Sequence, residues 1–398
     1  MDLSSLLHLL LMGVLVASLP LSIVWMSADP HKYRKLVWVM VFLTFDLIVF
    51  GGFTRLTDSG LGCPDWPGCY GEANPFLAHE HIAAAEAAMP TGPVTVAKAW
   101  IEMIHRYLAM GIGALILALL FTSVKQWRRT HNEVFKPAMP LALLASVLVQ
   151  GAFGAWTVTL KLQPVIVTIH LLLGMMLLAM LVWMGCREDY LLKPPPLARH
   201  RGQARGQARG QARDLVRRLG GLRILSLLAA AVLVTQIALG GWVSTNYATM
   251  ACDTFPLCQG ALVPELDFEH GFHLWRELGM TKEGHYLPFS ALVAIHWVHR
   301  AFALAVVLVL GLAAWRAWRL PEVGKTARRL LLVMAVQLLT GIATVYFDFP
   351  LAIAVMHNAG AALLVILVTM LNYRVKFQLD AARAAPATDI ADVRTDPR

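Results

Sequence analysis

The stretch "GGFTRLTDSGLGCPDWPGC" at residues 51–69 returns later in the chain as "GGWVSTNYATMACDTFPLC" at residues 240–258. Both stretches open on a glycine pair and end in Pro-x-Cys, and they align without a gap. Each also carries two cysteines at the same spacing. The chain therefore contains an internal duplication, and each copy has its own cysteine pair.

The composition is that of a membrane protein. Of the 398 residues, 58% are hydrophobic and only 15% are charged, whereas a typical soluble domain is about 45–50% apolar and about 25% charged. A helix needs roughly 20 apolar residues to cross a bilayer. Nine runs meet this requirement, at residues 3–26, 36–57, 100–124, 138–160, 164–184, 222–243, 289–314, 327–347 and 350–372. We therefore predict an all-α integral membrane protein with nine spans.

The duplication extends beyond the opening stretch. Three further motifs recur: "IHR" (104–106) as "VHR" (298–300), "QGAFGAWTV" (150–158) as "QLLTGIATV" (337–345), and "VTIH" (167–170) as "AVMH" (354–357). Each copy holds an even number of spans, so both copies face the same way across the membrane. The sequence therefore predicts a parallel repeat of two four-helix bundles.

These patterns divide the chain into five segments. They are an extra N-terminal transmembrane helix with a basic loop (1–35), an N-terminal four-helix half (36–184), an Arg-rich cytoplasmic linker (185–221), a C-terminal four-helix half (222–372) and a cytoplasmic tail (373–398). The extra helix stands outside the repeat and is expected on its periphery. The linker contains "RGQARGQARGQAR" (201–213), which we expect to be flexible; binding of RNA or of lipid headgroups is the alternative.

The distribution of Lys and Arg predicts the orientation. Segment 185–223 carries ten Lys and Arg against three acidic residues, whereas the loop at 58–99 carries one Lys and five acidic residues. Basic segments stay on the cytoplasmic side. We therefore expect both cysteine loops and the N-terminus in the periplasm of a bacterial inner membrane, and the C-terminus in the cytoplasm. The net charge of +9 then reflects topology, not nucleic-acid binding.

Histidines inside the spans are the main candidates for function, because ionisable groups in a membrane are costly. His105 and His170 lie at matched depths in the first half, and His299 and His357 do so in the second. Two facing imidazoles suit a haem iron, which takes one axial nitrogen ligand on each face. Zinc is the rival, but it usually needs four ligands. The alternative is that each histidine is an ordinary core residue, hydrogen-bonded within the protein and without a ligand.

The residues around these histidines differ between the halves. Glu102 precedes His105 by three positions, where the second half has His296 before His299. Positions i and i+3 share a helix face, so Glu102 is expected to face the first pocket as an acid–base group. We assign chemistry to the N-terminal half and a bound haem b to the C-terminal half. A charge that stabilises the helix N-terminus is the alternative for Glu102.

The arginines that follow the histidines are candidates for contact with a haem propionate. They are Arg106 and Arg300, and a guanidinium forms strong hydrogen bonds with carboxylates. Reaching toward water along the membrane surface is the alternative.

The cysteines have neither the Cys-x-x-Cys-His pattern of covalent haem attachment nor a zinc spacing. On the oxidising side of the membrane we expect the disulfides Cys63–Cys69 and Cys252–Cys258. The second is expected to pin its loop. For the first, both a structural clip and a catalytic role in relaying electrons or holding an intermediate stay open.

These residues resemble the haem A synthase family over residues 36–372, and the proteobacterial branch most closely. The marks are the 51–69 stretch, the paired cysteines, Glu102-x-x-His105-Arg106, His170, His299-Arg300 and His357. The resemblance implies an enzyme that oxidises the C8 methyl of haem O to a formyl group, by two successive hydroxylations and loss of water. The product, haem A, serves cytochrome oxidase. Family members have eight helices, so the extra N-terminal span is a departure.

The resemblance also implies roles for single residues. His299 and His357 would ligate haem b, His105 and His170 would hold haem O, and Glu102 would assist at the methyl group. Many members use the first cysteine pair in catalysis, while others lack cysteines. The expected partners are haem O delivered by a haem O synthase, an unidentified electron acceptor and membrane lipid, with no nucleic acid. A homo-oligomer is compatible with the sequence.

Three other functions remain compatible with the residues. A bis-His carrier with two permanent b haems, linked to quinol, would need no chemical role for Glu102. A disulfide-generating membrane oxidase would use the cysteine pairs alone. A transporter of two halves would use its histidines to relay protons.

Overall fold

The computed structural model describes residues 3–192, 205–321 and 323–383. Its long helices are α1 (Leu3–Met26), α2 (Lys32–Leu56), α4 (Val96–Thr130), α5 (Ala138–Thr159), α6 (Pro164–Leu192), α8 (Arg205–Thr245), α10 (Phe289–Trp318), α11 (Gly324–Tyr346) and α12 (Leu351–Arg383). Shorter elements are α3 (His79–Ala88), the 3₁₀ turn η1 (Glu133–Phe135) and α9 (Phe268–Gly271). Within these described ranges, nine helices are long and apolar enough to cross a membrane. The predicted multi-pass helical membrane protein is confirmed.

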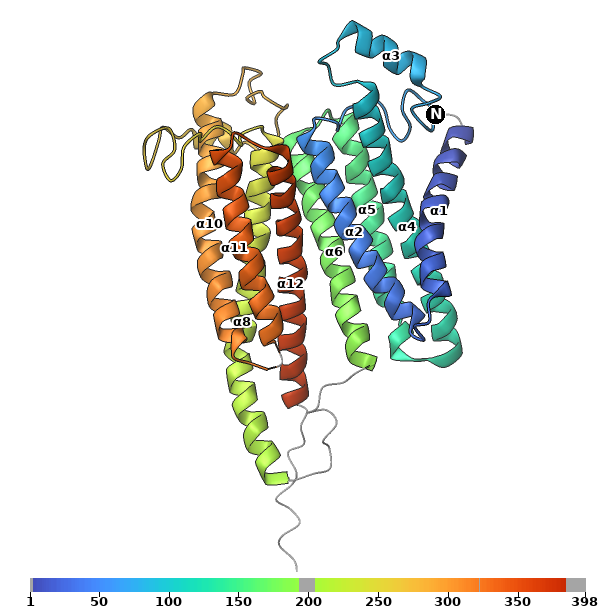
Figure 1. Ribbon diagram of the computed structural model, residues 1–398, viewed down its shortest axis with the longest axis vertical. Coiled ribbons are helices and arrows are strands. Elements are labelled where there is room, and N and C mark those ends of the chain that lie inside the picture. Colours follow the sequence, from blue (N-terminus) through green and yellow to red (C-terminus); the bar gives the residue numbers. More distant parts are fainter. Residues whose placement is uncertain (1–2, 193–204, 322, 384–398) are drawn as a thin grey trace, which may run out of the picture.

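The helices that follow α1 pack as two groups of four (Figure 1). In the first group α2, α4, α5 and α6 contact one another in a closed ring, and in the second group α8, α10, α11 and α12 do the same. The groups meet where α12 contacts α2 and α6, and where α6 contacts α8. Helix α1 packs on α4 and α2 at the edge of the first group. That a two-fold axis relates the groups stays a prediction.

The loops that carry the cysteine pairs lie at one end of the helices, which we call the cysteine-loop end (Figure 1). A polar cluster joins the two groups there. The Arg55 guanidinium donates to the carbonyl oxygen of Ser244 at 2.6 Å and lies 4.0 Å above the centre of the Tyr247 ring. The Tyr247 hydroxyl donates in turn to Asp58 Oδ1 at 2.7 Å. The two duplicated stretches therefore contact each other directly.

The same tight turn precedes α6 and α12 at the cysteine-loop end. Residues 161–162 and 348–349 are left-handed, with φ between 50° and 61°, a conformation that ends a helix and reverses the chain. His170 is the seventh residue of α6, and His357 is the seventh of α12. With a rise of about 1.5 Å per residue, the two histidines lie equally far from the starts of their helices.

The apolar core lies on the far side of the histidines from the cysteine loops. On α4, His105 is followed by the buried Ile112 and Leu115, and on α6, His170 is followed by the buried Leu178 and Leu181. These residues join a cluster that also includes buried side chains of α8, α10 and α12. The histidines thus lie between this core and the cysteine loops, whose backbone offers hydrogen-bond partners.

The linker and the tail differ from the sequence prediction. Helix α6 continues to Leu192, and α8 begins at Arg205, so residues 205–213 of the expected flexible linker are helical. Ala, Gln and Arg are good helix formers, and extending an existing helix avoids the cost of nucleation; these gains outweigh the glycines. Helix α12 likewise continues to Arg383. Residues 193–204 and 384–398 lie outside the described ranges.

Candidate functional site

Each histidine that the sequence singled out lies against a glycine of a neighbouring helix. In the first group, a methyl group at Gly51 of α2 would lie 2.9 Å from Cε1 of His105, and one at Gly154 of α5 would lie 3.2 Å from Cε1 of His170. Real Cβ atoms essentially never approach as closely as 2.9 Å. Only glycine therefore leaves room for the imidazole at Gly51.

The second group repeats this arrangement. A methyl group at Gly240 of α8 would lie 2.9 Å from Cε1 of His299, and one at Gly341 of α11 would lie 3.0 Å from Cε1 of His357. Gly51 and Gly240 are the first glycines of the duplicated stretches, which gives the repeated Gly-Gly pair its physical reason. Within each pair, His105 with His170 and His299 with His357, the imidazoles lie close enough to interact electrostatically.

The hydrogen bonds to the imidazoles differ between the groups. In the second group, the Thr340 hydroxyl lies 3.1 Å from Nδ1 of His357 and donates its own proton to the Gln337 carbonyl oxygen at 3.0 Å. The hydroxyl oxygen is therefore free to accept the proton on Nδ1 of His357. The Gln236 amide nitrogen lies 3.2 Å from Nδ1 of His299. An amide nitrogen only donates, so Nδ1 of His299 accepts from Gln236, whereas Nδ1 of His357 can donate to Thr340.

The first group lacks these contacts. Nδ1 of His105 and Nδ1 of His170 are buried and have no hydrogen-bond partner among the described residues. In the aligned motif, Phe153 stands where the second group has Thr340. Gln150 donates to the His170 carbonyl oxygen at 3.1 Å and lies 3.5 Å from its Nε2. The sequence marked Gln150 and Gln337 as repeated, but Thr340 and Gln236 were missed as partners of histidine.

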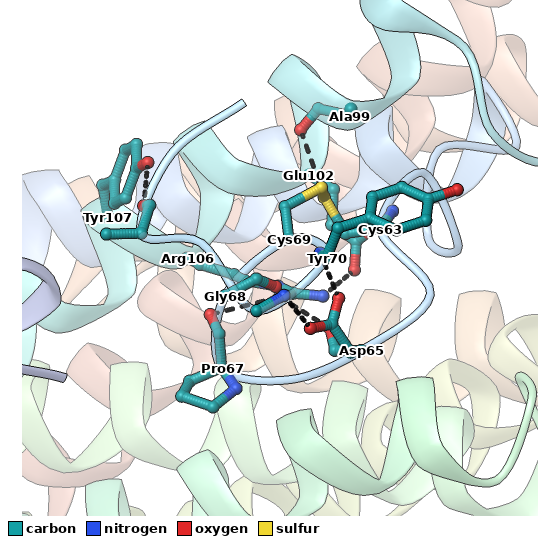
Figure 2. Close-up of a disulfide and its surroundings, with 12 residues drawn as sticks. Cys63, Asp65, Pro67, Gly68, Cys69, Tyr70, Ala99, Glu102, Arg106 and Tyr107 are labelled. Atoms are coloured by element: carbon teal, nitrogen blue, oxygen red, sulfur yellow. Dashed lines mark hydrogen bonds and ion pairs between the residues drawn. A yellow bond between two sulfur atoms is a disulfide. The ribbon is translucent and has the colours of Figure 1, made fainter. Parts of the chain in front are cut away.

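The first cysteine loop is held against α4 (Figure 2). A disulfide joins Cys63 and Cys69, with the Cα atoms 4.9 Å apart. The Glu102 carboxylate accepts the Cys63 backbone N–H at 2.8 Å and forms an ion pair with Arg106. The sequence placed Glu102 beside His105 on one face of the helix; the structure shows both of its oxygens directed to the cysteine loop and Arg106.

Arg106 is the residue that ties the loop together (Figure 2). Its Nη1 donates to the carbonyl oxygens of Asp65 at 3.0 Å, Pro67 at 3.2 Å and Gly68 at 2.5 Å. The Asp65 carboxylate accepts the backbone N–H groups of residues 70 and 71, both at 2.6 Å. The guanidinium expected at a propionate thus serves the loop backbone here, and a propionate contact for Arg106 stays a prediction.

The second cysteine loop is also closed by a disulfide and bonded to a transmembrane helix, but through different side chains. A disulfide joins Cys252 and Cys258, and the Cys252 backbone N–H donates to Nδ1 of His296 at 3.2 Å. His296 thus takes the place of Glu102. Arg300 donates from Nη2 to the Thr254 carbonyl oxygen at 2.7 Å, while its Nη1 is buried without a partner among the described residues. Both predicted disulfides are confirmed.

Elsewhere in the described ranges, no three His, Cys, Asp or Glu side chains come together in a way that could hold a metal ion. The histidine pairs are therefore the metal-binding candidates that remain, two imidazoles at a time.

The comparison with known proteins matches this architecture. The model of a family described as Cytochrome oxidase assembly protein, COX15-CtaA, matches residues 34–369. The chain belongs to this family. The match spans both histidine pairs and both cysteine loops, and it leaves out α1.

Alignments with individual relatives also cover most of both chains. The chain is 36% identical over 342 residues to Heme A synthase of Shewanella oneidensis, which covers 85% of this chain and 96% of that protein. It is 33% identical over 353 residues to Heme A synthase of Chelativorans sp., covering 82% of this chain and 88% of the relative. Heme A synthase of Novosphingobium aromaticivorans is 30% identical over 373 residues, with shares of 85% and 93%.

Proposed function

We propose that this protein is a haem A synthase, an oxidoreductase that oxidises the C8 methyl group of haem O to a formyl group. The observation that carries the proposal is the relationship to proteins named Heme A synthase across both helix groups. It is supported by the four histidines, each seated against a glycine, that such a reaction on a haem would use.

The side chains present fit haem as the ligand of each pair. An iron porphyrin has two axial positions and takes up or releases one electron at a time at its iron. Each pair offers two partly buried imidazoles from different helices, and glycines stand where the neighbouring helices pass the rings. At His357, the Thr340 hydroxyl holds the proton on Nδ1 and leaves Nε2 with a free lone pair for iron. The Gln337 amide lies 3.2 Å from that Nε2 and would have to turn away for the nitrogen to hold iron.

The two pairs are suited to different tasks. Hydrogen bonds to the second nitrogen of a ligating imidazole fix its orientation and typically change metal affinity about 10–100-fold. The Thr340 hydroxyl is such a partner at Nδ1 of His357, whereas Nδ1 of His105 and Nδ1 of His170 have none among the described residues. The second pair therefore suits a resident haem b, and the first suits haem O, which must arrive, react and leave as haem A. This assigns the substrate and the cofactor to the halves that the sequence predicted.

The remaining residues act around these pairs. Glu102, one helical turn from His105 on α4, takes up protons released at the methyl group. Cys63 donates its backbone N–H to Glu102, so the loop closed by the Cys63–Cys69 disulfide positions that carboxylate, and the disulfide beside it is our candidate for relaying electrons. Arg300 presents a buried Nη1 that has no hydrogen-bond partner among the described residues, which fits a propionate of haem b. Arg106 takes the corresponding place at haem O.

The cellular setting follows from the charges. Basic segments adjoin the helix ends opposite the cysteine loops. This distribution supports a bacterial inner membrane as the location, with the cysteine loops and the N-terminus in the periplasm and the C-terminus in the cytoplasm. Haem O comes from a haem O synthase in the same membrane. The electrons removed from the methyl group need an acceptor, and α1, at the edge of the first group, offers a surface for self-association.

The test is to express the chain together with a source of haem O and to identify the extracted haems. Haem A in the extract, beside haem b, supports the proposal. Two molecules of b haem per chain with no haem A would instead favour a permanent electron carrier. A protein that takes up haem O and returns it unchanged would refute the synthase activity.

A further inference from the structure

An acidic side chain lies in the middle of α2 on its outward-facing surface. Asp46 is exposed, and among the described residues it has no hydrogen bond or ion pair. It stands ten residues before the end of α2 at Leu56, about 15 Å along the helix, close to the middle of a hydrocarbon layer about 30 Å thick. An unpaired carboxylate at that depth is costly and marks function by default, so a role for it is expected.

Asp46 lines a groove of about 380 Å³ between the two helix groups. Three further residues of α2 line it, Val49, Phe50 and Phe53, together with Val355 of α12. The α2 residues share one helix face by their spacing, and the centres of the two phenylalanine rings lie 5.9 Å apart. The groove is thus apolar and partly aromatic, and it opens to the outside of the bundle. Its one carboxylate lies at the end farther from the cysteine loops.

The groove lies next to the first histidine pair. The Phe50 ring stacks on the His105 imidazole, with ring centres 6.3 Å apart and planes 21° apart. A ligand in the groove would therefore lie one side chain away from His105, a proposed ligand of the first iron, which is where a molecule that exchanges electrons with that site belongs.

We propose that this groove binds a membrane-soluble quinone, with its ring against Phe50 and Phe53 and a ring oxygen hydrogen-bonded to the Asp46 carboxyl group. The inference rests on the proposed function, because it supplies the electron acceptor that the reaction needs. Conversion of a methyl group to a formyl group with one water releases four electrons and four protons. Two quinones take up these electrons and protons and leave as two quinols, so the reaction balances.

The chemistry of the groove favours a quinone over other occupants. A lipid acyl chain has no group for the carboxyl to bond, and a second copy of the chain would have to bury Asp46 without a partner of its own. A quinone is flat, dissolves in the membrane and bears oxygens that bond a carboxylic acid, while the quinol bears hydroxyl donors for a carboxylate. The corresponding position of the second group is Thr235, so the carboxyl group is not repeated there.

The experiment uses the purified protein with its haem b, without oxygen, and decylubiquinol as the probe. Quinol bound in the groove passes electrons to the haem, and the absorbance of ferrous haem reports the rate. We expect Asp46→Asn to lower this rate at least tenfold, while dithionite still reduces all the haem and haem content is unchanged. Val49→Trp fills the groove without removing the carboxyl and is expected to slow reduction similarly. Phe42→Leu, one turn from Asp46 and lipid-exposed, serves as the control and should match the unaltered protein.

The outcomes separate this inference from the proposed function. Reduction of the unaltered protein by decylubiquinol, lost in both groove variants, supports the quinone site whether or not the cells make haem A. No reduction of the unaltered protein, or equal rates in Asp46→Asn, overturns it. Haem A formation in cells with unimpaired reduction of Asp46→Asn would leave the synthase standing and remove the groove from electron transfer.

Discussion

Replacing Thr340 with valine tests the reason why one haem stays and the other leaves. Valine keeps the shape of threonine and removes the hydroxyl that lies 3.1 Å from Nδ1 of His357. The proton on Nδ1 then stays buried without an acceptor, as at His170 in the first group. We therefore expect His299 and His357 to bind haem b more weakly, as we propose that the first pair binds its haem.

The size of the effect follows from the lost contact. An unsatisfied buried polar group costs about 1–3 kcal/mol, and each 1.4 kcal/mol is tenfold in affinity. Loss of a hydrogen bond behind a metal ligand typically costs about 10–100-fold in metal affinity. Haem b should therefore dissociate about 10–100-fold more readily from Thr340→Val than from the unaltered protein.

The assay transfers haem b from the detergent-purified protein to an excess of apomyoglobin and follows the rate and the end point by absorbance. Thr340→Ser keeps the hydroxyl and should restore retention to within about threefold, which excludes a folding defect as the cause. Thr235→Val removes a hydroxyl that donates only to a backbone carbonyl of its own helix and serves as the matched control.

The reciprocal change is Phe153→Thr, which places a hydroxyl at the aligned position behind His170. It should slow the loss of haem from the first pair. If Thr340→Val and Thr340→Ser retain haem b equally well, the hydroxyl does not hold the cofactor, and the assignment of the halves loses its structural basis.

Three further changes test the rest of the site. Glu102→Gln should leave haem b content unchanged and lower haem A formation at least about 100-fold, as expected when a catalytic acid–base group is lost; normal haem A in the extract would remove Glu102 from the mechanism. Cys63→Ser should lower haem A formation at unchanged haem b content, whereas turnover equal to that of the unaltered protein would reduce the disulfide to a structural clip. Gly240→Val should strip haem b from the purified protein, because even a methyl group there would lie 2.9 Å from His299; full haem occupancy by absorbance would show that α8 can move aside without cost.

Several features of this protein could be predicted from its sequence because they follow from local composition and from repetition. The spans follow from apolar runs of bilayer length, and the structure has helices at all nine predicted places within its described ranges. The disulfides follow from cysteine pairs with five residues between them in loops of the same kind. The flexible linker was wrong at 205–213, because a glycine-containing repeat next to a long helix extends that helix.

What tertiary structure alone decided is which side chains meet. The Thr340 hydroxyl reaches His357 from another helix, and Gln236 reaches His299 in the same way; neither contact has a sequence spacing that marks it. The Glu102 carboxylate bonds the cysteine loop through a backbone N–H 39 positions away, and Asp46 faces a groove completed by α12. Hydrogen bonds act over about 3 Å, so the partners of a buried group depend on how helices pack, whereas the number and length of the helices depend only on the residues within each one.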